Sequence, residues 1–501
     1  MVFEFECVDS LPLLAWCARV ESAGVVRVRH GPGVEVRNDA FVEGAWDGEF
    51  GAMAFDEAIG LAGSGGRLRG DGVVFASPFH PLEYLYVLAI KDALLVSNSL
   101  AFVFAEADDR PDIRYYNYFF DLLKHARRGL PNLPIALPTA GGRRIRPFQV
   151  CNLRVDRDLT YHEIPKPLPA APACYGDYYG ELLRSVTGVA RNAADPRRKR
   201  TYRLVSAISK GYDSTAAAAL ASKAGGREAV TFVKSAAGHD ITDDSGAEIA
   251  RTLGMTVTEY DRSDVRTLPG FPEAEFFSNP GNLGEVGLRV MEPGLKGSLF
   301  TTGRHGEDFL GVTGKCIRRD LREPADTGLP GRGGTEFRIR AGYLNFPALY
   351  LGALHSSHLY RITHSQEMRP WTLGVDSYDR PIPRRIAEEA GVPRAFFGQR
   401  KMGGPGGLLR GFSDASERDF REFCQAEVPA RILQRLNQSR QGERDLWHFR
   451  MARIRKEYAA HAMIGPLLEL AQLDRWHAMW NSINLYRFHW GFERIRGRYR
   501  V

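Results

Sequence analysis

The pattern of apolar and polar positions changes part-way along the chain. In the first third, short β-prone runs at 72–77, 84–90 and 93–97 are separated by turn-forming residues, as in hairpins. The stretch 145–155 resumes this strand-like alternation, while aromatic residues and leucines at helical spacing predict a helix over 114–130. This part of the chain is therefore expected to be rich in β-strands.

Farther along, helical and strand-like segments alternate. Apolar residues at helical spacing predict a helix over 176–196. Short apolar runs predict strands at 204–208, 230–233 and 256–260, with an alanine-rich helix after the first and a helix at 243–254 before the last. Such alternation implies a parallel sheet, which binds its ligands at the carboxyl ends of its strands.

A proline-rich stretch at 165–172 is typical of a linker, because prolines leave few helical options. It divides the chain into two predicted domains, 1–172 and 173–501, and a chain of this length is too long for a single core. Further helices are predicted at 344–361, at 384–393 and beyond residue 410.

Composition is that of an ordinary globular protein, with 44% hydrophobic and 25% charged residues. No apolar run approaches the roughly 20 residues that a membrane-spanning helix needs, and the acidic N-terminus does not resemble a signal peptide. The six cysteines are scattered without a C-x-x-C pair, which argues against a zinc site or a disulfide scaffold. A cytoplasmic protein without membrane contact is expected.

The net charge of +7 is partly local, in basic runs at 197–200 and 494–500. Such runs are compatible with nucleic acid, with an anionic small substrate, or with ordinary arginine usage. We favour the last interpretation, and a tRNA partner stays open.

The loop after the first of these parallel strands carries the clearest candidate chemistry. A loop between a strand and a helix directs backbone N–H groups at one point, which suits phosphate or pyrophosphate. Gly211 permits close approach of an anion, and an acid at this point argues for a bridging Mg²⁺. The candidate nucleotide-binding residues of this loop are Ser209, Lys210, Gly211, Tyr212, Asp213, Ser214 and Thr215, with Ser214 as the expected N-cap.

Ser209, Gly211, Asp213 and Ser214 resemble the Ser-Gly-Gly-x-Asp-Ser loop of the N-type ATP pyrophosphatases, the group that contains asparagine synthetase. Lys210 departs from the pattern, because it replaces the first glycine and would either crowd a pyrophosphate or add positive charge to it. An ordinary strand-to-helix turn is the alternative.

A second glycine-rich motif, at 299–311, is similar to the family's S-G-x-G-(A/G)-D-E-L-F-G. The resemblance places Gly303 at the nucleotide, and Glu307 and Asp308, in swapped order, on the motif's two acids, which would join Asp213 in holding Mg²⁺. A surface turn with solvated acids is the alternative. Arg304, three positions before Glu307, does not match the family, so the second substrate is expected to differ.

Two later segments carry the remaining catalytic candidates. Residues 365–371 are similar to the family's S-L-E-x-R-x-P-F-L, with Glu367 and Arg369 expected either to orient substrate or, more simply, to form a structural ion pair. Lys401 lies in a loop like the family's R-x-K-x-G, which implies contact with the α-phosphate and the developing negative charge. Residues 322–340, rich in Gly and Pro, are interpreted as a lid or as an insertion without catalytic role.

The first 172 residues are similar to the N-terminal-nucleophile (Ntn) glutaminase half of asparagine synthetase-type proteins. In working glutaminases a cysteine directly follows the initiator methionine, and its free amine activates the thiol. Here Val2 stands at that position, and the amine of Cys7 is locked in a peptide bond, so no glutamine hydrolysis is expected. Cys7 and Cys17 are predicted to be buried small hydrophobes.

The resemblance implies an α/β protein with a degenerate Ntn-type αββα sandwich followed by a parallel-sheet synthetase domain of the PP-loop, adenine nucleotide α-hydrolase-like class. It also implies an AMP-forming carbon–nitrogen ligase like the family's glutaminase-inactive members, such as β-lactam synthetase. ATP and Mg²⁺ would be needed, the partners would be a small-molecule carboxylate and an amine or ammonia, and a homodimer stays open. The alternatives are an RNA-modifying ATP pyrophosphatase and a non-catalytic scaffold.

Overall fold

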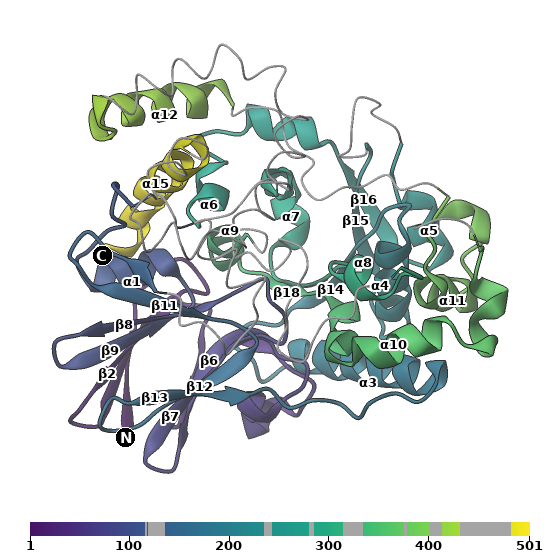
Figure 1. The fold of residues 1–501 in the computed structure, drawn as a ribbon, viewed down its shortest axis with the longest axis horizontal. Coiled ribbons are helices and arrows are strands. Elements are labelled where there is room, and N and C mark those ends of the chain that lie inside the picture. Colours follow the sequence, from purple (N-terminus) through teal and green to yellow (C-terminus); the bar gives the residue numbers. More distant parts are fainter. Residues whose placement is uncertain are drawn as a thin grey trace, which may run out of the picture.

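The computed structural model describes residues 1–115, 118, 136–234, 243–279, 285–313, 334–374, 378–399, 413–430 and 482–500. The protein is a mixed α/β structure with three sheets. Two largely antiparallel sheets are formed before residue 166, and the third, which is parallel, lies beside them (Figure 1). The predicted α/β class is confirmed at this level.

The two antiparallel sheets pack face to face through an apolar core. Trp16 lies against Phe41 and Phe75, with ring centroids 5.0 and 5.9 Å away. The larger sheet has the order β1 (Val2–Cys7), β3 (Val25–His30), β2 (Trp16–Glu21), β9 (Ala93–Ser97), β8 (Leu85–Ile90), β11 (Arg144–Phe148) and β10 (Leu137–Pro138). The smaller has the order β13 (Tyr161–Pro165), β12 (Cys151–Val155), β7 (Gly72–Ala76), β6 (Ala62–Arg69), β5 (Ala40–Ala45) and β4 (Glu35–Arg37). The predicted strands at 72–77, 84–90 and 93–97 are confirmed.

The stretch predicted as one strand over 145–155 is instead two strands in different sheets. β11 pairs with β8 in the larger sheet, and β12 pairs with β7 in the smaller. Val150 between them has a left-handed backbone, with φ of 50°, and this turn carries the chain from one sheet to the other. Most of the predicted helix at 114–130 lies outside the described residues.

The parallel sheet has the order β16 (Thr256–Tyr260), β15 (Glu228–Phe232), β14 (Arg203–Ala207), β17 (Ser298–Thr301) and β18 (Leu344–Phe346). The predicted strands and the helices α3 (Tyr175–Ala193) and α4 (Tyr212–Lys223) are confirmed, while α5 (Ala247–Thr252) is shorter than the helix predicted there. Residues 344–346 were predicted as helix and form β18, because a buried place beside β17 outweighs their helical spacing.

The remaining helices lie partly around this sheet and partly, as for α1 and α15, beside the larger N-terminal sheet (Figure 1). They are α1 (Leu100–Glu106), α6 (Ala274–Phe277), α7 (Glu292–Leu295), α8 (Gly306–Phe309), α9 (Thr335–Ala341), α10 (Ser356–Thr363), α11 (Pro381–Glu389), α12 (Asp414–Glu427) and α15 (Ser482–Arg496). Short 3₁₀ helices are η1 (Phe50–Ala52), η2 (Phe55–Glu57), η3 (Arg262–Thr267), η4 (Val286–Met291), η7 (Ala348–His355), η8 (Gln366–Trp371), η9 (Arg394–Phe396) and η11 (Gly497–Tyr499). The last helix returns to the N-terminal part, where Phe492 packs on Phe104 of α1.

The stretch predicted as a linker, 165–172, forms no helix or strand beyond Pro165, and part of it packs on the protein. The Lys166 side chain is buried, and the Pro169 carbonyl is 2.8 Å from Nε2 of His355. The end of the predicted lid at 322–340 is likewise structured, because Thr335–Ala341 forms the buried helix α9, while 314–333 lie outside the described residues.

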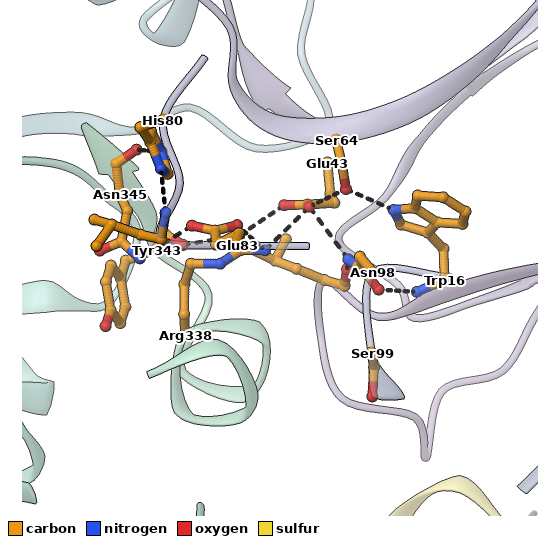
Figure 2. Close-up of polar contacts among 12 residues, drawn as sticks. Trp16, Glu43, Ser64, His80, Glu83, Asn98, Ser99, Arg338, Tyr343 and Asn345 are labelled. Carbon is orange, nitrogen blue, oxygen red and sulfur yellow. Dashed lines mark hydrogen bonds and ion pairs between the residues drawn. The ribbon is translucent and has the colours of Figure 1, made fainter. Parts of the chain in front are cut away.

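A buried polar network joins the N-terminal sheets to α9 and β18, as Figure 2 shows. Arg338 of α9 is fully buried, and its guanidinium donates to the Glu43 carboxylate at 2.7 and 3.1 Å and pairs with Glu83 at 2.9 Å. Asn345 of β18 donates to Glu83 at 3.0 Å, and Ser64 donates to Glu43 at 2.7 Å. Burial raises the pKa of Glu83 to about 7, although Arg338 opposes this shift.

Candidate functional site

The predicted nucleotide loop lies at the carboxyl end of β14, in the middle of the parallel sheet. The helix that follows begins at Tyr212 with Gly211 as its N-cap, so the prediction of Ser214 as N-cap is wrong. Ser214 lies in the first turn, where its hydroxyl is 2.8 Å from that of Ser209, and Thr215 donates to the Gly211 carbonyl at 2.8 Å. The first N–H groups of a helix have no partner within it, so the loop keeps the character of an anion site.

Lys210, the departure from the family pattern, is directed away from this helix terminus. Its Nζ lies 2.5 Å from the Asp243 carboxylate, and its backbone N–H donates to Asp244 at 3.3 Å. Its carbonyl accepts from the N–H of Gly398 at 2.8 Å. In this arrangement the lysine does not crowd the loop, and Asp243 neutralises its charge.

Tyr212, a predicted nucleotide-binding residue, has its side chain in the interior. It is almost fully buried, and it packs between Tyr378 and Phe397 at ring-centroid distances of 5.1 and 5.8 Å. Arg384 donates to its hydroxyl. Tyr212 therefore fixes the loop on α11, and only its backbone remains a candidate for contact with a ligand.

The second motif follows β17, the strand next to β14, and it packs directly on the first. A Cβ added at Gly303 would lie 2.2 Å from the carbonyl carbon of Asp213 and 2.4 Å from the nitrogen of Ser214. A Cβ at Gly306 would lie 2.7 Å from Cγ of Asp213. Only glycine permits this contact at either position, so the two predicted motifs lie together at the carboxyl ends of adjacent parallel strands.

The three predicted metal ligands are arranged unequally. Asp308 is buried, and one of its oxygens lies 3.3 Å from Nδ1 of His305, whose own backbone is left-handed with φ of 66°. The Glu307 side chain is about one-third exposed and is directed towards Arg380, 3.9 Å from it. The interpretation of this segment as a surface turn with solvated acids therefore does not hold for Asp308.

Asp213 is engaged by Arg380, a residue that the sequence reasoning missed. The guanidinium pairs with Oδ2 of Asp213, while Oδ1 is buried and has no hydrogen-bond partner among the described residues. Arg380 immediately precedes α11, which begins three residues before the predicted start at 384. The only signal in the sequence was Pro381, a residue favoured in the first turn of a helix.

The acids around Arg380 do not suit a metal ion bound by the protein alone, but they suit one that is also bound by a nucleotide. Within the described ranges, no three His, Cys, Asp or Glu side chains gather into a group that suits a metal ion, and the guanidinium of Arg380 stands between Asp213 and Glu307. The residues therefore do not fit a resident metal. Magnesium commonly uses one or two carboxylates plus substrate phosphates, and the unpaired Oδ1 of Asp213 fits that more limited role.

The other candidate residues lie apart from these two loops. Glu367 of η8 accepts from the N–H of Tyr175, at the start of α3, at 3.0 Å, and its second oxygen is 3.3 Å from Arg385. Its ion pair is thus structural, and it is made with Arg385 rather than with Arg369. Lys401 lies outside the described residues. Arg304 pairs with Glu285 at 2.8 Å.

Most arginines of the two basic runs have partners within the protein. Arg197 pairs with Asp195, and Arg198 is buried over the Phe50 ring. In the C-terminal run, Arg494, Arg496, Arg498 and Arg500 pair with Asp419, Glu493, Glu275 and Asp108, respectively. These arginines are therefore engaged within the protein, whereas Nε of Arg200 has no hydrogen-bond partner among the described residues.

The cysteines of the first two strands differ in exposure. Cys17 is buried as predicted, and burial raises the pKa of its thiol well above the ordinary value. The prediction that Cys7 is buried is wrong, because it lies exposed at the end of the edge strand β1.

Comparison with known proteins assigns no family to this geometry: no family model matches the chain, and no curated protein matches it. In the part of the chain that the structure describes, no helix is long and apolar enough to cross a membrane.

Proposed function

We propose that the protein is an ATP-dependent, AMP-forming carbon–nitrogen ligase of the asparagine synthetase type. The observation that carries the proposal is the contact of the two motif loops. Gly303 lies against the peptide that joins Asp213 to Ser214, at the start of α4. A phosphate loop and an acidic loop thereby meet at the carboxyl ends of β14 and β17. The finer assignment of an Ntn-type αββα sandwich joined to a PP-loop domain belongs to this proposal.

In the proposed reaction, a carboxylate oxygen of the substrate attacks the α-phosphorus of ATP, and the bond to pyrophosphate breaks. An amine or ammonia then attacks the acyl carbon, forms the amide, loses a proton and releases AMP. The N–H groups at the start of α4 and the hydroxyls of Ser209 and Ser214 would hold the pyrophosphate, where they oppose the charge of the leaving group. Asp213 would contact magnesium that arrives with the nucleotide.

The proposal gives different roles to the two catalytic candidates, Lys401 and Glu367. Lys401 keeps its proposed contact with the α-phosphate, where a flexible ammonium suits a charge that develops in the transition state. Glu367 takes a positioning role, because its carboxylate is occupied by α3 and Arg385. In this proposal the ammonia or amine comes from solution.

ATP–pyrophosphate exchange tests the proposal. Purified protein with Mg·ATP and panels of small carboxylates is expected to exchange labelled pyrophosphate into ATP, and to release AMP rather than ADP once an amine is added. Asp213→Ala should lose both activities, whereas Asp264→Ala, at an exposed position on η3, should keep them. Release of ADP, or activity that survives Asp213→Ala, would contradict the proposal.

A non-catalytic scaffold is the second candidate, and the pairing of Arg380 with Asp213 favours it. Equilibrium dialysis with labelled ATP separates the two functions, because a scaffold with a lost site would not bind the nucleotide. The RNA-modifying alternative has less support, since most arginines of both basic runs have acidic or internal partners.

A further inference from the structure

We propose that Arg380 takes, in the nucleotide-free protein, the position of a divalent cation between the two acidic loops, so that the site accepts no free metal ion. This inference concerns the same site as the proposed function but does not depend on it. Metal binding without nucleotide is measurable whether or not the protein turns over ATP.

The contacts of Arg380 are those that a bridging cation would make. One end of its guanidinium pairs with Asp213 in the first loop, and the other end faces Glu307 in the second loop at 3.9 Å. The Arg380 side chain is only 8% exposed. A single positive group therefore joins acids that lie on different loops, and like a metal it reduces their mutual repulsion.

The backbone around Arg380 holds it in this direction. The carboxylate of the preceding residue, Asp379, accepts from the N–H groups of Leu373 and Gly374 at 2.7 and 3.2 Å and from Arg384 at 2.9 Å. Its carbonyl accepts from the N–H of Val312, just after the second motif, at 3.0 Å. These bonds leave the Arg380 side chain directed at Asp213.

Charge explains why a free metal ion would not displace this group. An arginine guanidinium keeps its charge at neutral pH, so Arg380 remains a cation beside Asp213. A metal ion that took Asp213 would leave the buried guanidinium with only the Glu307 carboxylate, 3.9 Å away, as an acidic partner. A nucleotide removes the obstacle, because its phosphate oxygens offer the guanidinium new acceptors with matching geometry.

Titration of the nucleotide-free protein with Mn²⁺ alone, followed by electron paramagnetic resonance of the free ion, tests the inference. Wild type is expected to show no site tighter than about 1 mM, whereas Arg380→Gln should gain one site at least about tenfold tighter. Arg380→Lys keeps the charge and should gain nothing. Adding Asp213→Asn to Arg380→Gln should abolish the gain.

The matched control is Arg361→Gln, at an exposed position on α10, which should leave Mn²⁺ binding as in wild type. Mn²⁺ should also raise the melting temperature of Arg380→Gln but not that of wild type. A tight Mn²⁺ site in wild type would overturn the inference, and so would a folded Arg380→Gln variant that binds no better than wild type. If Arg380→Gln fails to fold, the wild-type and Arg380→Lys titrations still decide.

Discussion

Lys166 offers the sharpest test of the fold, because its amine is buried without a partner. The residue follows the edge strand β13, and its Nζ has no hydrogen-bond partner among the described residues. Burial lowers the pKa of Lys166 to about 7, although Cys151 and Asp56 nearby act in the opposite direction. Replacement by methionine keeps a flexible chain of similar volume and removes the buried charge.

The size of the effect follows from the difference in proton affinity between the folded and unfolded chain. A pKa lowered from 10.5 to about 7 corresponds to roughly 5 kcal/mol. The folded protein binds this proton less tightly than the unfolded chain does. The loss of folding stability caused by the buried ammonium is therefore complete below about pH 7 and disappears as the pH rises towards 10.5. Lys166→Met should gain about 2 to 5 kcal/mol at pH 6.5 and almost nothing near pH 10.

The test is to measure the melting temperatures of wild type and Lys166→Met from pH 6.5 to pH 10. For 501 residues unfolding together, the entropy of unfolding is about 1 kcal/mol per degree, so the expected gain is about 2 to 5 °C at pH 6.5. Lys223→Met, an exposed change at the end of α4, should give no pH-dependent difference. If Lys166→Met lowers the melting temperature at pH 6.5, the ammonium has a stabilising partner and the reasoning fails.

Three further outcomes are expected. Burial raises the pKa of Glu83 from 4.5 to about 7, so about 3 kcal/mol of folding stability is present below pH 4.5 and is lost as the pH rises through 7. In Glu83→Gln, the melting temperature should therefore depend less steeply on pH over this range. In thiol labelling followed by mass spectrometry, Cys7 should react in the folded protein and Cys17 only after unfolding; equal rates would contradict the burial of Cys17. Glu367→Gln should lower the free energy of unfolding, measured by urea titration, by about 1 kcal/mol, because it weakens the pair with Arg385. A loss of turnover at unchanged stability would instead give Glu367 a direct role in the reaction.

The sequence revealed those parts of the site that depend on local spacing. The turn before α4 and the glycines at 303 and 306 were identifiable because each needs a particular residue type at a fixed offset. Arg380 was not identifiable, because it meets Asp213 across 167 positions and only the packing of α11 on α4 brings them together. A pattern within one segment carries no information on a contact of that kind.

The errors in the fold have the same origin. Residues 344–346 have helical spacing, but they form a strand because they pair with β17 at the edge of the sheet. The turn at Val150 divides the stretch predicted as one strand into two strands that belong to different sheets. The predicted linker was recognised by its prolines alone, which gave no sign that Lys166 would be buried. In each case a neighbour distant in sequence decided the local conformation.

The same distant contacts make the N-terminal part a support for the rest of the chain. Arg338 is fully buried, and its carboxylate partners, Glu43 and Glu83, both belong to the N-terminal part. Without that part, the guanidinium would have neither partner, and α15 would lose the surface of α1 on which it packs. Removing one side of a buried ion pair typically costs about 3 to 5 kcal/mol, a large share of the stability of a protein. The N-terminal sheets therefore contribute directly to the stability of α9 and of the parallel sheet beside it.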